Sequence, residues 1–195
     1  ATRKIVVIGV FSAIAAILMV LEFPVPFAPS FYGLDFSELP ALIGAFAYGP
    51  VAGVMIEFCK ILIKLVLKPS STAFVGELAN FSISCMLVLP ASVIYLFKKS
   101  RKQAILGTVV GTLIMTAFGS CFNAIYLLPK FSELYGIPLD AIIGMGTAIN
   151  PAIHSISGLV LMCVVPLNLL KGGLVSLITI LVYKKLSPIL KAAHK

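Results

Sequence analysis

An asparagine and a lysine stand one helical turn apart in an otherwise apolar part of the sequence. The stretch reads Pro-Leu-Asn-Leu-Leu-Lys-Gly-Gly, with an amide at Asn168 and an ammonium at Lys171. An ionisable side chain inside a membrane segment is costly unless it is paired, reaches the interface or faces a water-filled cavity. Because an amide both donates and accepts hydrogen bonds whereas a lysine only donates, this pair could bind the polar edge of a small molecule.

The composition places this pair in a membrane. Of the 195 residues, 60% are hydrophobic and 11% are charged, and the mean hydropathy is +1.11, far above the values of soluble globular domains. Long polar stretches are almost absent. We therefore expect one integral membrane domain over residues 1–195, with no soluble domain and no room for a nucleotide-hydrolysing one.

Basic residues indicate which ends of the membrane segments lie in the cytoplasm. Ten of the fifteen fall in three clusters: Arg3 and Lys4; Lys98, Lys99, Arg101 and Lys102; and Lys184, Lys185, Lys191 and Lys195. The positive-inside rule puts all three clusters in the cytoplasm. No acidic residue lies within them, so the net charge of +8 is a topology signal and does not indicate nucleic-acid binding.

Four apolar stretches are long enough to cross about 30 Å of hydrocarbon. They are Ile5–Leu21, Phe74–Phe97, Ala104–Leu127 and Pro166–Leu186. An even number of crossings must separate two cytoplasmic clusters, so Leu39–Leu67 must cross twice although Gly49-Pro50 interrupts it. We expect a short helix over Leu39–Tyr48 and a longer one from Pro50 to about Leu67. The fold class is thus all-α, with six transmembrane helices and both termini cytoplasmic.

Two long connections should lie at the outer face. The first, Glu22–Glu38, is rich in aromatic residues and suits a lid over a ligand: Phe23, Phe27, Phe31, Tyr32 and Phe36. The second, Leu128–Val165, contains Asn150 and His154, to which we assign no role. Its apolar part, Ile153–Val165, is interpreted as a partly inserted or docked helix, because a separate span would put the carboxyl-terminal lysines outside.

Polar residues from several segments share the outer depth of this arrangement. They are Asp35, Glu77, Asn80, Asn123, Asn168 and Lys171. Groups far apart in sequence but equal in depth could line one pocket that opens to the outside. Other interpretations remain open: Lys171 could extend to the interface, Asn168 could bond another helix, and Asp35 with Glu38 could cap the short helix.

Four motifs carry a resemblance that covers most of the chain. They are Asp35-Phe36-Ser37-Glu38-Leu39-Pro40, Gly49-Pro50-Val51-Ala52-Gly53, Gly76-Glu77-Leu78-Ala79-Asn80-Phe81 and Pro166-Leu167-Asn168-Leu169-Leu170-Lys171-Gly172. In this order and spacing the chain resembles the riboflavin-specific substrate-binding (S) component of the energy-coupling factor (ECF) vitamin transporters. The resemblance implies a cell-membrane protein with six helices, a riboflavin pocket under a first-loop lid, and a complex with a transmembrane coupling subunit and two cytoplasmic ATPases.

The resemblance also implies roles for particular residues. Asn123, Asn168 and Lys171 would hydrogen-bond the ligand, and Asp35, Phe36, Glu77 and Asn80 would be further contacts. Small residues of the first helix form two ridges, Gly9-x-x-x-Ala13 and Ser12-x-x-x-Ala16, which are similar to the surface of S components that meets the coupling subunit. The alternative for these ridges is packing within the bundle.

Other classes of protein fit less well. The sequence has no convergent nucleophile, acid–base pair or metal-ligand spacing, so we expect no enzyme, no metal site and no cofactor. An autonomous secondary transporter would place its site near the midplane between repeats; this class and an S component for another vitamin remain the alternatives. Glu57, Lys60 and Lys64 follow one another at one-turn spacing, and we interpret them as an internally paired stripe that faces the interior of the bundle. The alternative is a proton relay, which is less favoured because no further acids continue the series inward.

Overall fold

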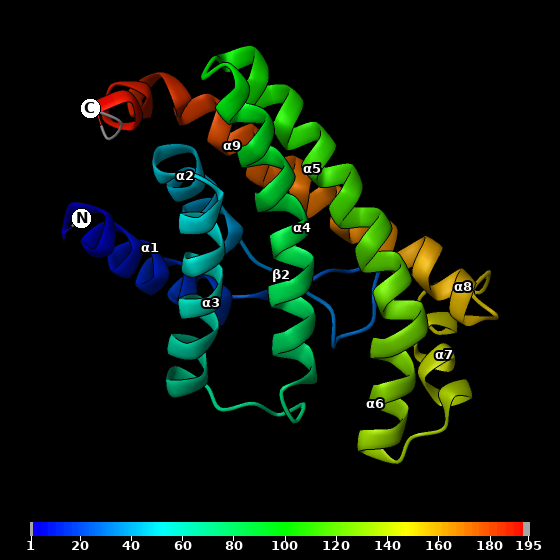
Figure 1. Cartoon of the computed structure of the whole chain (residues 1–195). Helices are drawn as coiled ribbons and strands as arrows, with labels where there is room; N and C mark the ends of the chain where they lie inside the picture. Colours follow the sequence, from blue (N-terminus) through cyan, green and yellow to red (C-terminus); the bar gives the residue numbers. More distant parts are fainter. Residues whose placement is uncertain (1, 193–195) are drawn as a thin grey trace.

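Helices make up most of residues 2–192, the part of the chain that this computed structural model describes (Figure 1). Seven continuous helical runs follow in order: α1 (Thr2–Val20); α2 (Glu38–Tyr48); α3 (Pro50–Leu67); α4 (Val75–Phe97); α5 (Arg101–Phe122) with η1 (Asn123–Leu127) and α6 (Leu128–Tyr135); α7 (Leu139–Thr147); and α8 (Ile156–Leu159) with η2 (Val160–Val164) and α9 (Val165–Ala192). The loop after α1 contains a small antiparallel ribbon of β1 (Phe23–Pro24) and β2 (Gly33–Leu34), in which Phe23 pairs with Leu34.

The all-α membrane class is confirmed. Four runs are long and apolar enough to cross a membrane: Thr2–Val20, Val75–Phe97, Arg101–Tyr135 and Ile156–Val182. The expected short second helix is present, because α2 has only 11 residues. The turn that ends it requires Gly49, whose φ of 93° is unfavourable for other residues, and Pro50 then suits the first turn of α3.

The expected segment boundaries after residue 122 are wrong in two places. Leu128–Val165 is not a loop at its start, because the α5 helix continues to Tyr135. The separate docked helix over Ile153–Val165 does not exist either: from Ile156 the chain runs without a break into α9. This stretch lengthens the last span and adds no crossing.

Both errors have the same physical reason, a π-helical turn before a proline. Proline usually ends or begins a helix, because its ring clashes with the carbonyl four residues earlier. Here a wider π-helical turn precedes each proline, closed by the Leu128 N–H on the Asn123 carbonyl and by the Val165 N–H on the Val160 carbonyl. The wider turn accommodates the ring of the next residue, Pro129 or Pro166, so the helix continues.

Glycines allow the central helices to pack closely. A Cβ at Gly107 would lie 2.5 Å from the Ala91 carbonyl oxygen, and one at Gly111 would lie 2.6 Å from that of Leu87. These two glycines, one turn apart on α5, therefore form the seam with α4, a small-residue contact of the kind common between membrane helices. This seam packs α4 tightly against α5, which in turn contacts α9.

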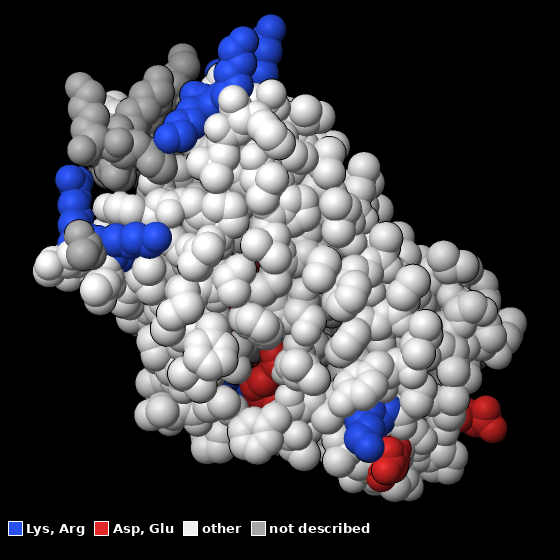
Figure 2. All heavy atoms as spheres, in the orientation of Figure 1, with Lys and Arg blue, Asp and Glu red and all other residues white. Residues whose placement is uncertain are grey.

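The two ends of the molecule differ in charge. The start of α1, the α4–α5 turn and the far end of α9 lie together at one end, and the α3–α4 loop lies at the other (Figure 1). Lys and Arg side chains gather at the first end, whereas a hollow with acidic atoms inside it opens towards the second (Figure 2). Lys195, part of the third expected basic cluster, lies outside the described residues.

Candidate ligand-binding site

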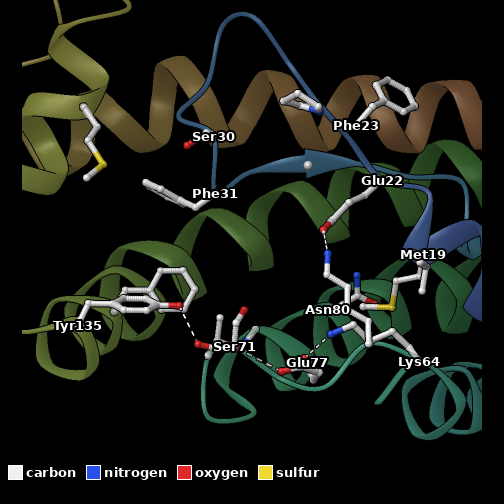
Figure 3. Close-up of a pocket in the computed structure, with 18 of the residues that line it drawn as sticks. Met19, Glu22, Phe23, Ser30, Phe31, Lys64, Ser71, Glu77, Asn80 and Tyr135 are labelled. Atoms are coloured by element: carbon white, nitrogen blue, oxygen red, sulfur yellow. Dashed lines mark hydrogen bonds and ion pairs between the residues drawn. The ribbon is translucent and has the colours of Figure 1, made fainter. Parts of the chain in front are cut away.

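Two neighbouring cavities lie at the end of the bundle opposite the basic clusters. The outer cavity, of about 690 Å³, is enclosed by the ribbon loop, α3, α4 and the α6–α7 region (Figure 3). The inner cavity, of about 160 Å³, lies deeper, between α4, the η1 turn and α9. Both are lined by Phe31 and Phe131, whose rings meet edge-to-face with centroids 6.1 Å apart. This aromatic pair therefore stands between the two cavities.

The inner cavity combines polar groups with apolar walls. Its polar lining comes from five segments of the chain: Tyr32, Glu38, Asn80, Ser84, Asn123, Asn168 and Lys171. Its apolar lining includes Ile83, Met115, Val164 and Leu167. A flat, largely apolar molecule with one polar edge is the kind of ligand that such a lining suits.

Lys171 is held by two carboxylates. Its Nζ lies 3.0 Å from Asp35 Oδ2 and 2.8 Å from Glu38 Oε1, and its side chain is 11% exposed. Burial alone would raise the pKa of Asp35, but Lys171, Lys60 and hydrogen bonds from Ser37 hold that pKa below its usual value. Lys171 therefore does not extend to the interface; it ties the end of the ribbon loop to α9.

Lys60, on α3, contacts the same group of side chains as Lys171. Its Nζ donates to Ser37 Oγ at 3.1 Å, forms an ion pair with Glu57 one turn away, and lies 4.0 Å from Glu38. Both Lys60 and Glu57 are completely buried. The expected internal pairing of Glu57 with Lys60 is confirmed, whereas Lys64 bonds to another helix, at 2.5 Å from Glu77 Oε1.

Asn123 is positioned by its neighbours. It begins the η1 turn; its Oδ1 accepts from the Tyr32 hydroxyl at 2.8 Å, and its Nδ2 donates to the Gly119 carbonyl at 2.7 Å. Asn168 is also buried, but its amide makes no hydrogen bond to another described residue, so the alternative of an interhelical hydrogen bond is wrong for the part of the chain described. A buried amide with free bonding capacity at a cavity is suited to a ligand.

The outer cavity holds ion pairs that join its walls. Glu77 accepts from Lys64, from Ser70 at 2.8 Å and from Thr72 at 3.2 Å, so its carboxylate is already occupied (Figure 3). The partly exposed pair of Lys68 and Glu22, 3.5 Å apart, links α3 to the ribbon loop. Asn80 lines both cavities, and its Oδ1 is buried without a partner among the described residues.

Most of the expected site residues come together, and two do not reach a cavity. Asn80, Asn123, Asn168 and Lys171 line the inner cavity, and Glu77 lines the outer one. Asp35 lines neither; it forms an ion pair with Lys171 and accepts the Ser37 N–H at 2.8 Å. That bond lies before α2, whose N-cap is Ser37 and which has no capping hydrogen bond from a side chain, so the capping alternative for Asp35 is wrong. Phe36 packs instead beside Phe23 and the core around α2. Glu38 was not expected to line a cavity, and Tyr32 was expected only as part of the aromatic lid.

The two small-residue ridges of α1 face in different directions. Gly9 and Ala13 are exposed, and a Cβ at Gly9 would meet no atom within 4 Å. Ser12 and Ala16 are completely buried, and the Ser12 hydroxyl donates to the Ile8 carbonyl. The packing alternative therefore holds for Ser12 and Ala16, which no partner can reach in this arrangement, whereas Gly9 and Ala13 lie on the surface.

An all-α membrane protein with a polar-lined pocket near one end of its helix bundle is a membrane-embedded binding protein. The sequence matches the family described as "ECF transporter, substrate-specific component" over residues 3–183, nearly its whole length. The chain belongs to this family: it is the S component of an ECF transporter, an integral protein of the cell membrane and not an enzyme.

Individual relatives agree with this assignment. The chain is 33% identical to the riboflavin transporter RibU of Staphylococcus aureus (strain TCH60), covering 97% of this chain and 93% of that protein. It is 32% identical to the riboflavin transporter FmnP of Bacillus subtilis (strain 168), covering 95% and 93%. A solved S component of a bacterial ECF transporter superimposes with a TM-score of 0.74 at 35% identity, covering 97% of this chain and 98% of that one.

Proposed function

We propose that this S component binds riboflavin from the outer face and delivers it for ATP-driven uptake. The observation that carries the proposal is the lining of the inner cavity. It combines the amides of Asn80, Asn123 and Asn168 and the ammonium of Lys171 with apolar side chains. Riboflavin has a planar tricyclic ring, a dione edge that alternates acceptor and donor, and a ribityl chain of hydroxyls. Asn123, Asn168 and Lys171 can serve the dione edge, and the S. aureus and B. subtilis relatives are named riboflavin transporters.

The cavity volumes favour a ligand that occupies both chambers. The inner cavity of about 160 Å³ is smaller than the ~300–1,000 Å³ typical of small-molecule sites, whereas the outer one of about 690 Å³ falls within that range. The ligand then extends past Phe31, with its dione edge inside. The hydroxyl-rich and charged lining of the outer cavity, including Ser30, Ser71 and Thr72, suits a ribityl chain.

The charge distribution supports the orientation. Basic residues lie in the first turn of α1, between α4 and α5 and in the first turn of α5, at the end opposite the cavities. By the positive-inside rule that end is cytoplasmic. With α2 and α3 counted as crossings, six helices span the membrane, both termini lie inside, and the cavities open to the outside.

Delivery of the ligand requires partners. The ECF family assignment supports a complex with a transmembrane coupling subunit and two cytoplasmic ATPases. The exposed Gly9 and Ala13 allow another helix to approach α1 closely, and we assign the coupling subunit to this surface. ATP-driven movement of the coupling module then turns the S component so that its pocket reaches the cytoplasm.

Titration of the purified protein with riboflavin tests the ligand and its site together. We expect saturable quenching of flavin fluorescence by the native protein, and loss of at least about tenfold in affinity for Asn168→Leu, because the apolar side chain cannot bond the dione edge. Asn150→Leu is the matched control, since Asn150 is exposed and lines neither cavity. Absence of quenching by the native protein would refute the riboflavin assignment.

A further inference from the structure

Glu38, in the first turn of α2, presents one satisfied and one unsatisfied oxygen. The side chain is 1% exposed and lines the inner cavity. All its partners approach Oε1: the Ser84 hydroxyl at 2.6 Å, Lys171 Nζ at 2.8 Å and Lys60 Nζ at 4.0 Å. Oε2 is shielded from water and has no hydrogen-bond partner among the described residues. A buried carboxylate oxygen left in this state is costly unless something else donates to it.

Among the described residues, no hydrogen-bond donor remains for Glu38 Oε2. Two buried ammoniums, Lys60 and Lys171, serve three buried carboxylates, those of Asp35, Glu38 and Glu57. With ordinary charges this cluster is one negative charge in excess. Every donor that reaches Glu38 is taken by Oε1. A donor for Oε2 can therefore come from a ligand in the inner cavity, which Glu38 lines.

We propose that Glu38 Oε2 accepts the imide N3–H of the flavin and thereby fixes which way the dione edge enters the inner cavity. This inference rests on riboflavin as the ligand. The edge presents two carbonyl acceptors on either side of one N–H donor, and lysine and asparagine can serve the carbonyls. The N–H needs an acceptor, and a carboxylate supplies a hydrogen bond about twice as strong as a neutral group does.

Asn80 is the competing acceptor, because its Oδ1 is also buried and unpartnered in the described part of the chain. An amide can turn to present either its oxygen or its nitrogen. Asn80 can therefore bond a donor or an acceptor of the ligand, and it does not select between them. The Glu38 carboxylate has no donor hydrogen to present. It rejects a carbonyl at the same place through repulsion between two acceptors, and in this way it determines specificity.

Substitution of Glu38 by glutamine should reverse this preference. Lys171 and Ser84 both donate at the Oε1 position, so the glutamine oxygen will occupy that position. The NH₂ group must then take the place of Oε2 and will face the imide N–H as a second donor. Glu38→Gln keeps the size of the side chain while it removes the proposed acceptor.

The test compares riboflavin with 3-methylriboflavin, which lacks the imide hydrogen, on the native protein, Glu38→Gln and Glu57→Gln. For the native protein we expect methylation to weaken binding about 10- to 100-fold, the range for loss of a hydrogen bond to a charged group. Glu57→Gln, which removes the same charge from the cluster but lines neither cavity, should retain this penalty. Glu38→Gln should bind riboflavin more weakly and lose most of the penalty.

The outcomes separate this inference from the proposed function. If the native protein binds riboflavin and 3-methylriboflavin equally, or if Glu38→Gln keeps the full methylation penalty, Glu38 is not the imide acceptor. The assignment of riboflavin as the ligand is then unaffected. If Asn80→Leu removes the penalty and Glu38→Gln does not, the acceptor is Asn80. If the native protein binds no riboflavin, the ligand assignment itself fails. Thermal unfolding of each variant in detergent verifies that it is folded.

Discussion

A methyl group added at Gly119 should weaken ligand binding without unfolding the protein. Gly119 lies on α5, one turn before Asn123, and faces Asn168 on α9. A Cβ at this position would lie 2.8 Å from Asn168 Nδ2 but 3.4 Å from the next atom, a methyl of Ile83. Gly119→Ala therefore pushes on the amide at the inner cavity and on little else.

The size of the effect follows from this geometry. The Asn168 amide must move by several tenths of an ångström, which breaks or bends its hydrogen bond to the ligand. Loss of such a bond costs about 1–2 kcal/mol, or roughly 5- to 30-fold in the dissociation constant. Alanine also favours the helix by up to about 1 kcal/mol relative to glycine. The stability of the ligand-free protein should therefore change by less than about 1 kcal/mol.

Gly173→Ala supplies the matched control for this prediction. Gly173 lies on α9 two residues after Lys171, and a Cβ there would meet no atom within 4 Å. Riboflavin titration by fluorescence quenching should give a native dissociation constant for Gly173→Ala and a raised one for Gly119→Ala. Equal and native affinity in both variants would show that the position of Asn168 does not matter to the ligand, and would overturn the site assignment.

Two further substitutions address the charge cluster and the surface of α1. Lys171→Met leaves Asp35 and Glu38 as buried carboxylates without their shared ammonium, so the free energy of unfolding should fall by about 3–5 kcal/mol; native stability in a denaturation experiment would contradict the buried pairing. Ala13→Trp should abolish co-purification with the coupling subunit and transport but leave riboflavin binding intact. Val109→Trp, on the exposed face of α5, is its control, and loss of flavin binding in Ala13→Trp would contradict the interface.

The sequence predicted the first half of the fold well, because its signals are local. Gly49-Pro50 combines a residue that tolerates positive φ with one that begins helices, and the turn between α2 and α3 lies there. The later boundaries depend on π-helical turns. No residue type demands such a turn, and Pro129 and Pro166 favour a break when they are considered alone.

The site residues were predicted from their shared depth in the membrane. A shared depth does not determine which side chains point into the cavity. Asn123, Asn168 and Lys171 lie at one level and meet at the inner cavity. The backbone of the ribbon loop is irregular, so no periodicity indicated that Tyr32 points inward while Phe36 packs elsewhere. Glu38 was missed because an acid in the first turn of a helix has a sufficient structural explanation there. Only its two inequivalent oxygens distinguish it from a capping residue.

The η2 turn also sets the rotational phase of the last helix. A turn closed over five residues contains one residue more than an α-turn, and each residue of an α-helix advances the side chains by about 100°. The extra residue within Val160–Val164 therefore decides which side of α9 carries Asn168 and Lys171. A chain shortened by one residue here could keep every cavity residue and still direct the amide and the ammonium away from the cavity. For this segment, length matters more than the identity of its apolar side chains.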